Sequence, residues 1–360
     1  MLEPAPPKTG ELVTLSLKPQ SGEEIQGLCR RLADQLSEHS ATPLHLLVFG
    51  KCSASTTTLD ALQNKIGHAD WPVTWVEGSA CDGSPVAGIQ VQAFSGTVER
   101  ISFGGRVVGS VFTEGGARQC LVGSLAGNDQ TLTRSEQTRR TFEELQTILV
   151  KAGFDLSDLV RTWFFLENIL SWYDEFNHER TAIYSGLKFR SGSLPASTGV
   201  AAKNPANTAL ALAAWAFRPL SKNVRAKEVA SPLQCPAPNY GSSFSRAMEI
   251  PTSTGRRLLI SGTASIAPGG KTVWAGDVRK QVDLTMDVVG AILNTRGFTF
   301  ADLTRATAYF RNPTDAGAFA EWLTTNQLLA MPVTSVQCDV CRNDLIFELE
   351  ADAETSAPLP

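Results

Sequence analysis

An internal repeat is the feature that most limits how this chain can fold. The segment QTRRTFEELQTILVKAGFDLSDLVRTWFFLEN, which begins at Gln137, aligns without a gap with QVDLTMDVVGAILNTRGFTFADLTRATAYFRN, which begins at Gln281. The coinciding residues are Gln137/Gln281, Ile148/Ile292, Gly153/Gly297, Phe154/Phe298, Asp158/Asp302, Leu159/Leu303, Arg161/Arg305 and Asn168/Asn312. Self-similarity over this length indicates that one structural unit occurs at least twice.

Each copy has the pattern of an amphipathic helix followed by a strand. Apolar residues recur at helical spacing, and Gly153 or Gly297 then marks a left-handed position that ends the helix. An Asp-containing turn leads into the strand. Alternating and β-branched runs before each copy, separated by Gly and Ser/Thr clusters, predict hairpins, and a second helix and two strands are expected after it.

A weaker third copy lies near the N-terminus. A proline precedes a predicted strand in the segments that begin at Trp71, Leu194 and Met331, and the residues before Trp71 have the pattern of helix, strand and helix. We therefore predict three units of about 120 residues, a usual domain size. The expected boundaries are residues 1–100, 101–220 and 240–355, with a polar, proline-bearing linker at 221–239.

The charge balance excludes some classes of partner. A formal net charge of −4 leaves no basic footprint with which to hold nucleic-acid phosphates, so nucleic acid is not expected as a partner. No apolar run approaches the roughly 20 residues of a membrane span, and the N-terminal MLEPAPPKTGELV lacks the apolar region of a signal peptide. We expect a cytoplasmic protein without a membrane partner, whose seven cysteines are reduced.

Neither a metal site nor a cofactor is predicted. The histidines, His39, His45, His68 and His178, lie far apart and lack metal-ligand spacing. Cys338 and Cys341 form a C-x-x-C pattern, but it lies on a predicted strand, and no second pair or nearby His completes a zinc site. The Gly-rich stretches lie in predicted hairpins and do not open a helix with a nucleotide-binding pattern.

Side-chain alternation on the repeated strand points to the third unit as the site. One face of that strand holds Arg305, Thr307, Tyr309 and Arg311, whereas the second unit has Arg161, Trp163, Phe165 and Glu167 there. Guanidinium groups bind carboxylates bidentately, so two arginines and a tyrosine suit a ligand with two carboxylates. Arg161 and Arg305 recur in both copies, and for them a solvated face or salt bridges between units are the preferred interpretation. Arg311 is the better ligand candidate.

The closing strand of the third unit carries two acids. LIFELEADA places Glu348 and Glu350 on one face, and its second-unit counterpart, ALALAAWAF, contains no acid. Burial raises a carboxyl pKa and a neighbouring Arg lowers it, so such a group can be tuned to act as a general acid. The competing interpretation is that both acids are exposed strand residues. For Glu350, the catalytic and the exposed interpretations are almost equally supported.

The order of predicted elements resembles the RidA (YjgF) superfamily. The shared pattern is a hairpin, a long helix, Gly-Phe-x-x-x-Asp-Leu, a strand, an "FN" helix, a proline and two closing strands, and DEFNHERTAIYSG from Asp174 is especially similar. The resemblance implies an α+β fold of three fused RidA-like units, each a mixed sheet with helices on its outer face. Members of that superfamily are trimers with ligand sites between subunits, so this chain is expected to form a pseudo-trimer, either monomeric or further associated.

Three segments resemble the chorismatases more narrowly. They are YGSSFSRAMEI at Tyr240, LLISGTASI at Leu258 and CRNDLIFELEADA at Cys341. The resemblance implies chorismate as the small-molecule substrate, with Glu348 protonating its enolpyruvyl group before pyruvate is lost. In that family a Cys seven residues before the catalytic Glu accompanies formation of 3-hydroxybenzoate, and Cys341 precedes Glu348 by seven. We therefore expect 3-hydroxybenzoate, with Glu348, Cys341 and Glu350 as catalytic candidates.

The expected substrate-binding residues are Arg311, Tyr309, Arg246, Tyr240, Gly262 and Arg342. Tyr240 and Arg246 are candidates because the resemblance to the chorismatases implies that they contact the ligand. A purely structural role in a hairpin explains both residues equally well. Gly262 suits close approach of a substrate ring to the backbone, or else a simple turn or bulge. Alternation places Cys341 on the face opposite Glu348 unless a turn at residues 342–344 resets the register.

Other products and functions stay open at this point. A chorismatase can instead give a dihydroxycyclohexadiene acid, or 4-hydroxybenzoate besides the 3-isomer. RidA-like imine hydrolysis is a second class, in which Arg342 would hold a small carboxylate and Glu350 would position water. A non-catalytic metabolite-binding module is the third. The paired acids on a core strand favour catalysis.

Overall fold

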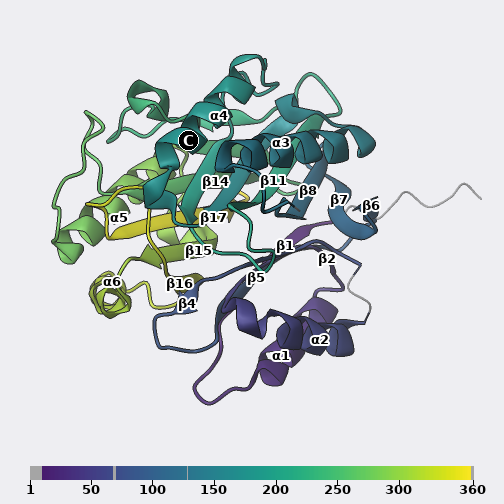
Figure 1. The fold of residues 1–360 in the computed structure, drawn as a ribbon, viewed down its shortest axis with the longest axis horizontal. Coiled ribbons are helices and arrows are strands. Elements are labelled where there is room, and N and C mark those ends of the chain that lie inside the picture. Colours follow the sequence, from purple (N-terminus) through teal and green to yellow (C-terminus); the bar gives the residue numbers. More distant parts are fainter. Residues whose placement is uncertain (1–9, 68–69, 128, 358–360) are drawn as a thin grey trace, which may run out of the picture.

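The computed structural model describes residues 10–67, 70–127 and 129–357 and contains three mixed β-sheets with helices on their outer sides (Figure 1). The N-terminal stretch considered above lies largely outside the described residues, as does His68. The predicted α+β class and the three RidA-like units are confirmed. Each sheet is built mainly from one of the three stretches of sequence.

The first unit is the smallest. Its sheet has the order β1-β5-β2-β3, and α1 and α2 cover one face. Its elements are β1 (Leu12–Leu17), α1 (Ile25–Glu38), β2 (Thr42–Gly50), α2 (Ser55–Ile66), β3 (Val73–Val76) and β5 (Val86–Phe94). The short strand β4 (Ser79–Ala80) leaves this sheet and pairs with the third one.

The second unit has the sheet order β10-β9-β11-β8-β7-β6. Its elements are β6 (Glu99–Phe103), β7 (Arg106–Glu114), β8 (Ala117–Leu125), α3 (Arg134–Lys151), β9 (Leu159–Leu166), α4 (Tyr173–Ser185), β10 (Ala196–Ala201) and β11 (Leu210–Pro219). Relative to the first unit it adds the hairpin β6–β7 at the edge of the sheet.

The third unit repeats this plan with the order β12-β13-β14-β17-β15-β16-β4. Its elements are β12 (Lys227–Val229), β13 (Ala247–Pro251), β14 (Arg256–Ala264), α5 (Val278–Asn294), β15 (Leu303–Phe310), α6 (Ala316–Thr325), β16 (Val333–Gln337) and β17 (Phe347–Thr355). Strand β12 lies within the stretch expected to be a linker and pairs with β13. Residues 227–229 of that stretch are therefore part of the third sheet.

The repeated segment folds as its sequence pattern predicts. Helices α3 and α5 are each followed by a glycine with positive φ, 80° at Gly153 and 70° at Gly297, where a side chain would be strained. A single 3₁₀ turn then leads into β9 or β15. Asp158 and Asp302 close capping boxes at these turns and so fix where each strand begins.

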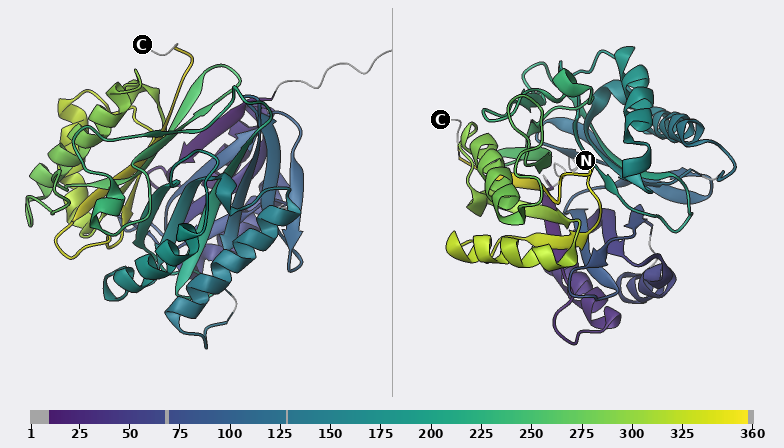
Figure 2. Two further views of the ribbon diagram at one scale, coloured as in Figure 1. Left: turned by 90° about the horizontal axis from the view of Figure 1, so that it is seen from above. Right: turned by 60° about the vertical axis from the view of Figure 1, so that its left-hand side comes forward.

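The three sheets pack against one another with the helix pairs on the outside (Figure 2). Each unit has its own apolar core between sheet and helices, and a fourth core lies where the sheets meet. Phe49, Phe165 and Tyr309, one from each unit, meet in this central core. The ring centroid of Phe49 lies 6.1 Å from those of both Phe165 and Tyr309. Equivalent strand positions therefore converge at the middle of the molecule.

A buried ion pair also joins the units. Glu114 of the second unit accepts hydrogen bonds from the Leu12 amide of the first unit and from Arg257 of the third, both at 2.9 Å. The side chains of Glu114 and Arg257 are each 1% exposed. Because a single carboxylate contacts all three units, it opposes their separation.

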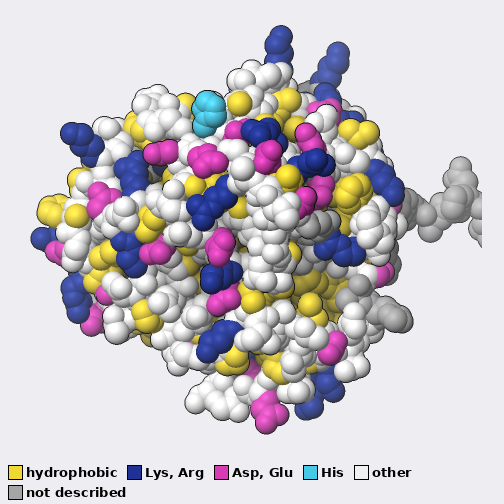
Figure 3. Space-filling model, viewed as in Figure 1, with side chains coloured by type: hydrophobic (Ala, Val, Ile, Leu, Met, Phe, Trp, Pro, Cys, Tyr) yellow, Lys and Arg dark blue, Asp and Glu magenta, His cyan; other side chains and the backbone are white. Residues whose placement is uncertain are grey.

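The outer surface is mixed in charge. On the face shown in Figure 3, Lys and Arg side chains are interspersed with Asp and Glu, without a large region of one sign. In the described part of the chain, no helix combines the length and apolar character needed to cross a membrane.

Replacing Glu114 with Ala should lower the free energy of unfolding by about 3 kcal/mol, because it removes the buried one of the two carboxylate partners of the Arg257 guanidinium and leaves only the more exposed Glu354. Unfolding in urea, followed by circular dichroism, measures this change. The matched control is Glu321→Ala, which removes an ion pair with Arg279 whose side chains are 60% and 64% exposed and should change stability by less than about 1 kcal/mol. Equal unfolding midpoints for the two variants would contradict the inter-unit role of Glu114.

Candidate functional site

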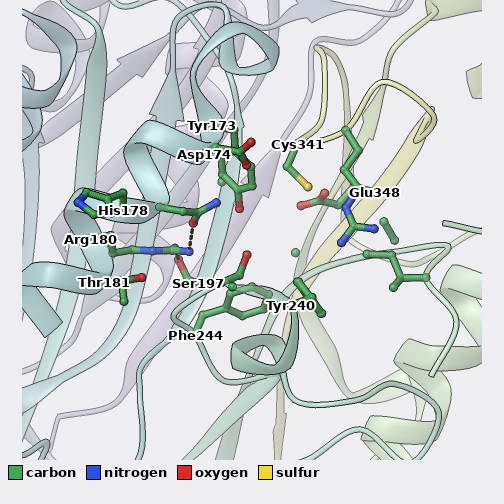
Figure 4. Close-up of a pocket in the computed structure, with 18 of the residues that line it drawn as sticks. Tyr173, Asp174, His178, Arg180, Thr181, Ser197, Tyr240, Phe244, Cys341 and Glu348 are labelled. Atoms are coloured by element: carbon green, nitrogen blue, oxygen red, sulfur yellow. Dashed lines mark hydrogen bonds between the residues drawn. The ribbon is translucent and has the colours of Figure 1, made fainter. Parts of the chain in front are cut away.

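A cavity of about 460 Å³ lies between the second and third units. Helix α4 and strand β10 form its second-unit side, and the third unit contributes β14, β17 and the loops around residues 240–246 and 341–342. Six of the predicted site residues line it: Tyr240, Arg246, Gly262, Cys341, Arg342 and Glu348. In Figure 4, Glu348 and Cys341 lie on one side of this cavity, opposite Arg180 and His178.

Glu348 reaches the cavity because Gly262 faces it without a side chain. Glu348 lies on β17 between Ala264 of β14 and Tyr309 of β15, and it is 4% exposed. A Cβ atom at position 262 would lie 2.0 Å from Glu348 Oε1, so any larger residue there would displace the carboxyl. The sequence suggested that a substrate ring approaches the backbone at Gly262. In the structure it is the Glu348 carboxyl that lies close to this backbone.

The surroundings of Glu348 favour its protonated form. Burial is the main cause that raises its pKa, to about 8, and the negative charge of Glu350 acts in the same direction. The positive charges of Arg161 and Arg246 oppose this shift. Among the described residues, no hydrogen bond holds the Glu348 carboxyl. A neutral carboxylic acid thus faces the cavity at pH 7.

Glu350 has the opposite environment, although it lies only two residues along the same strand. It is fully buried behind the cavity wall, where Arg161 and Thr198 each donate to Oε2 at 2.5 Å and Arg305 donates to Oε1 at 2.8 Å. Burial raises its pKa, but Arg305 and Arg161 outweigh burial, and the pKa is lowered overall. Glu350 is therefore a fixed anion outside the cavity, although the sequence made it a catalytic candidate.

Arg161 and Arg305 take part in this same buried cluster. Arg305 also donates to Asp352 at 2.7 Å and to Gln90 of the first unit at 2.9 Å. A salt bridge between units is confirmed for Arg161, which pairs with Glu350 of the third unit. Arg305 instead pairs with Glu350 and Asp352 of its own unit and reaches the first unit only through its hydrogen bond to Gln90. The cluster balances two guanidinium groups against two carboxylates.

Cys341 faces the cavity because a turn intervenes between it and β17. Strand β16 ends at Gln337, so the C-x-x-C residues lie in a loop rather than on a strand as the sequence suggested. The turn at residues 342–344 resets the register, and Cys341 and Glu348 line the same cavity. Burial, followed by the charge of Glu348, raises the pKa of Cys341 to about 12. Its thiol is therefore neutral.

Two arginines of the third unit lie against Tyr240. Arg246 donates to the Cys235 carbonyl at 2.8 and 3.1 Å and lies 5.4 Å from the Tyr240 ring centroid. Arg342 donates to the Gly270 carbonyl at 2.8 Å and lies 5.2 Å from the same centroid. In the described structure neither guanidinium has a carboxylate partner. Both keep positive charge available to a ligand.

The sequence analysis missed the second-unit side of the cavity, including Tyr173, Asn177 and Arg180 on α4. Arg180 is 1% exposed, donates to Asn177 Oδ1 at 2.6 Å, and has an Nε atom without a partner within the described residues. A usable signal was present: Arg180 follows Phe176 by four residues and precedes Tyr184 by four, so a charged residue occupies the buried face of this helix.

Tyr309 and Arg311 do not line this cavity, which corrects the face argument made from the sequence. Tyr309 is buried in the central core, where its hydroxyl donates to Glu350 Oε1 at 3.2 Å. Arg311 follows the end of β15 and turns toward the loop at residues 339–343. Alternation correctly placed the side chains of this strand on one face, but that face points to the other units and not to the cavity.

The acid at position 348 has no counterpart in the other two units. Strand pairing places Glu348 opposite Tyr309, Ala211 opposite Phe165 and Gly88 opposite Phe49. Because these three aromatic residues are equivalent, Ala211 and Gly88 occupy the positions that correspond to Glu348. Of the three equivalent positions, only the one in the third unit carries an acid, and its carboxyl faces the cavity between the second and third units.

Comparisons with known proteins agree with this architecture. Residues 236–355 match the family model described as Endoribonuclease L-PSP. A 3-hydroxybenzoate synthase of Streptomyces hygroscopicus is 23% identical over 243 residues, which span 60% of this chain and 68% of that protein. A chorismatase of the same organism is 26% identical over 211 residues, 53% of this chain and 60% of that protein, so the match spans less than two thirds of the latter.

A crystal structure of a chorismatase superposes with a TM-score of 0.70 at 18% identity and covers 96% of this chain and 99% of that one. The two proteins share their fold over nearly their whole length. In sequence the chain is similar to these two Streptomyces hygroscopicus proteins, and in fold it is similar to the chorismatase structure.

Infrared difference spectroscopy can detect the protonated carboxyl of Glu348 directly. We expect a carboxylic acid carbonyl band at pH 7 that is lost as the pH rises through about 8, because the folded-state pKa lies above the ordinary value. Glu348→Gln should remove the band, whereas Glu143→Gln on the exposed side of α3 should leave it unchanged. A spectrum without the band at pH 7 would show that Glu348 is ionised.

Proposed function

We propose that this protein is a chorismatase that converts chorismate to 3-hydroxybenzoate and pyruvate. The observation that carries the proposal is a buried acid, Glu348, in a cavity lined by arginines, where burial raises its pKa to about 8. The similarity to a 3-hydroxybenzoate synthase and to a chorismatase supports chorismate as the substrate. No cofactor enters the proposed reaction, since the two products together contain the same atoms as chorismate.

The charge of the cavity suits a substrate with two carboxylates. Arg180, Arg246 and Arg342 line it, and among the residues described here none of the three forms an ion pair with a carboxylate. The acids of the lining are Glu348, which is neutral at pH 7, and Asp174, which is exposed. Guanidinium groups on both the α4 side and the β17 side allow a dianion to span the boundary between the units.

Glu348 would act as the general acid. Donation of its proton to the methylene carbon of the enolpyruvyl group places positive charge beside the ether oxygen. The neighbouring ring hydroxyl then attacks the ring carbon that bears the ether, and the ether bond breaks so that pyruvate leaves with that oxygen. The bond between the hydroxyl oxygen and its original ring carbon then breaks, and the proton on the carbon that now bears the hydroxyl is lost, which restores aromaticity. One proton is added and one is lost, so the reaction neither consumes nor releases protons overall. A pKa near 8 keeps the acid loaded at neutral pH.

Cys341 would direct the reaction toward the aromatic product. Because its pKa is raised to about 12, it would act as a neutral, weakly polar wall rather than as a nucleophile. The aromatic branch consumes no water, whereas the branch to the diene acid needs one water molecule at the reacting carbon. A thiol beside Glu348 fills space that water would otherwise occupy.

Imine hydrolysis of the RidA type has less support. It would require Glu350 to position water, but both Glu350 oxygens accept hydrogen bonds from buried protein groups behind the cavity wall. Arg342 lines the cavity, but Glu350, which would have to act together with it, does not.

The first test is incubation of the purified protein with chorismate, without added metal or nucleotide, followed by chromatography of the aromatic products and an assay for pyruvate. We expect equal amounts of 3-hydroxybenzoate and pyruvate. Glu348→Gln should lower kcat by about 10²- to 10⁴-fold because it removes the proton donor. Unchanged chorismate with the wild-type protein would reject the proposal.

Cys341→Ala should shift the product from 3-hydroxybenzoate toward the diene acid, since a smaller side chain admits water beside Glu348. The ratio of the two products, measured on one chromatogram, reports the change independently of the total rate. Cys52→Ala is the control, because Cys52 is likewise partly buried but lies in the first unit, away from the cavity. An unchanged ratio in Cys341→Ala would remove Cys341 from product control.

A further inference from the structure

The loop that carries Cys341 and Arg342 into the cavity has no regular structure of its own. Between the end of β16 at Gln337 and the start of β17 at Phe347, the backbone forms only bends and turns. No strand pairing therefore fixes the position of Cys341 relative to Glu348. Something else must hold this segment, because both side chains meet in one cavity.

Arg311 contacts this loop at both of its ends. Its Nε donates to Asp339 Oδ1 at 2.9 Å, its Nη2 donates to the Arg342 carbonyl at 2.9 Å, and its Nη1 donates to the Asn343 carbonyl. Its backbone N–H also donates to the Ile346 carbonyl at 3.2 Å. One residue thus spans the loop from the residues before Cys341 to the residue before β17.

The base from which Arg311 acts is rigid. Arg311 directly follows β15, which is paired on both sides, with β16 and with β17. The last residue of β15, Phe310, accepts a hydrogen bond from the Cys338 amide at 2.9 Å. The loop is therefore fixed to the same sheet that carries Glu348, so the distance between thiol and carboxyl is set within one body.

The geometry requires a guanidinium rather than a positive charge alone. The Asp339 side chain is 45% exposed, and an ion pair this exposed contributes little by itself. The two backbone carbonyls, by contrast, are held by separate nitrogen atoms of a planar fork. A lysine could keep the pair with Asp339 but could not hold both carbonyls at once.

We propose that Arg311 is a positioning residue that holds the Cys341 loop against the Glu348 side of the cavity and thereby sets the product of the reaction. The part that concerns the product rests on the proposed function. The part that concerns the loop does not, because it follows from the hydrogen bonds that Arg311 makes with residues 339, 342 and 343, while Gln281 holds the loop further on, at Asp344 and Ile346. In this role Arg311 acts through the backbone of residues 342 and 343 and does not touch the substrate.

The loop part is tested by the rate at which iodoacetamide alkylates Cys341, followed by mass spectrometry of the folded protein. Loss of charge-assisted hydrogen bonds should ease local opening, so Arg311→Met should raise the rate about 10- to 100-fold. Arg311→Lys should also raise it, whereas Asp339→Asn, which retains the carbonyl contacts, should stay close to wild type.

Cys29 and Cys120 provide an internal control in the same experiment, because both are completely buried in helix–sheet cores. If Arg311→Met unfolded the protein as a whole, these two thiols would react faster as well. Faster alkylation of Cys341 alone supports the proposal. An unchanged rate at Cys341 in both Arg311 variants, or an equal increase at all three thiols in both, would overturn it.

The product part is tested with chorismate. Arg311→Lys should shift the ratio of products from 3-hydroxybenzoate toward the diene acid, in the same direction as Cys341→Ala, with a smaller change in KM than in the ratio. A wild-type ratio in a variant whose Cys341 is alkylated faster would overturn the link to product choice. If chorismate were not a substrate at all, the alkylation result would still decide the role of Arg311 in the loop.

Discussion

The site depends on a buried cluster of two arginines and two acids where the three sheets meet. Glu350 accepts hydrogen bonds from Arg161 of the second unit and Arg305 of the third, and Arg305 reaches Gln90 of the first. In a low-dielectric interior each of these charges would be strongly unfavourable alone, so the cluster is stable only when all three units are in register. Glu350 and Glu348 lie on the same strand. The strand register that gives Glu350 its hydrogen-bond partners therefore also fixes the position of Glu348.

Two carboxyl groups of one strand thus have different protonation states because their neighbours differ. Glu350 contacts two guanidinium groups and stays ionised, and its negative charge helps to keep a proton on Glu348. Gly262, which lacks a side chain where the Glu348 carboxyl lies, gives that carboxyl room to face the cavity. A fixed anion behind the wall and a neutral acid in front of it together make a proton donor at neutral pH.

Much of the fold was predictable from the sequence, because helices and strands follow from local periodicity. Gly153 and Gly297 marked the helix ends correctly, and the aligned prolines located β3, β10 and β16. Glu348 was found because an acid on a core strand is unusual. Local patterns could not reveal which unit a strand face would meet, so Tyr309 and Arg311 were assigned to the ligand.

Two other points have a similar cause. Arg180, which was missed, lies on a helix whose buried face meets another unit. For Cys341, alternation left the facing open, because the turn at residues 342–344 decides it. Periodicity and alternation encode neither the contact between units nor this turn.

The positions equivalent to Glu348 are alanine in the second unit and glycine in the first. In a trimer of identical subunits, any residue that suits one cleft must be accepted in all three, so a buried carboxylic acid would be introduced three times with its desolvation penalty each time. When the three units are joined in one chain, a residue at one cleft no longer has to be repeated at the other two. Each cleft can change sequence separately, and two of them are free to lose the acid and serve only as packing surfaces.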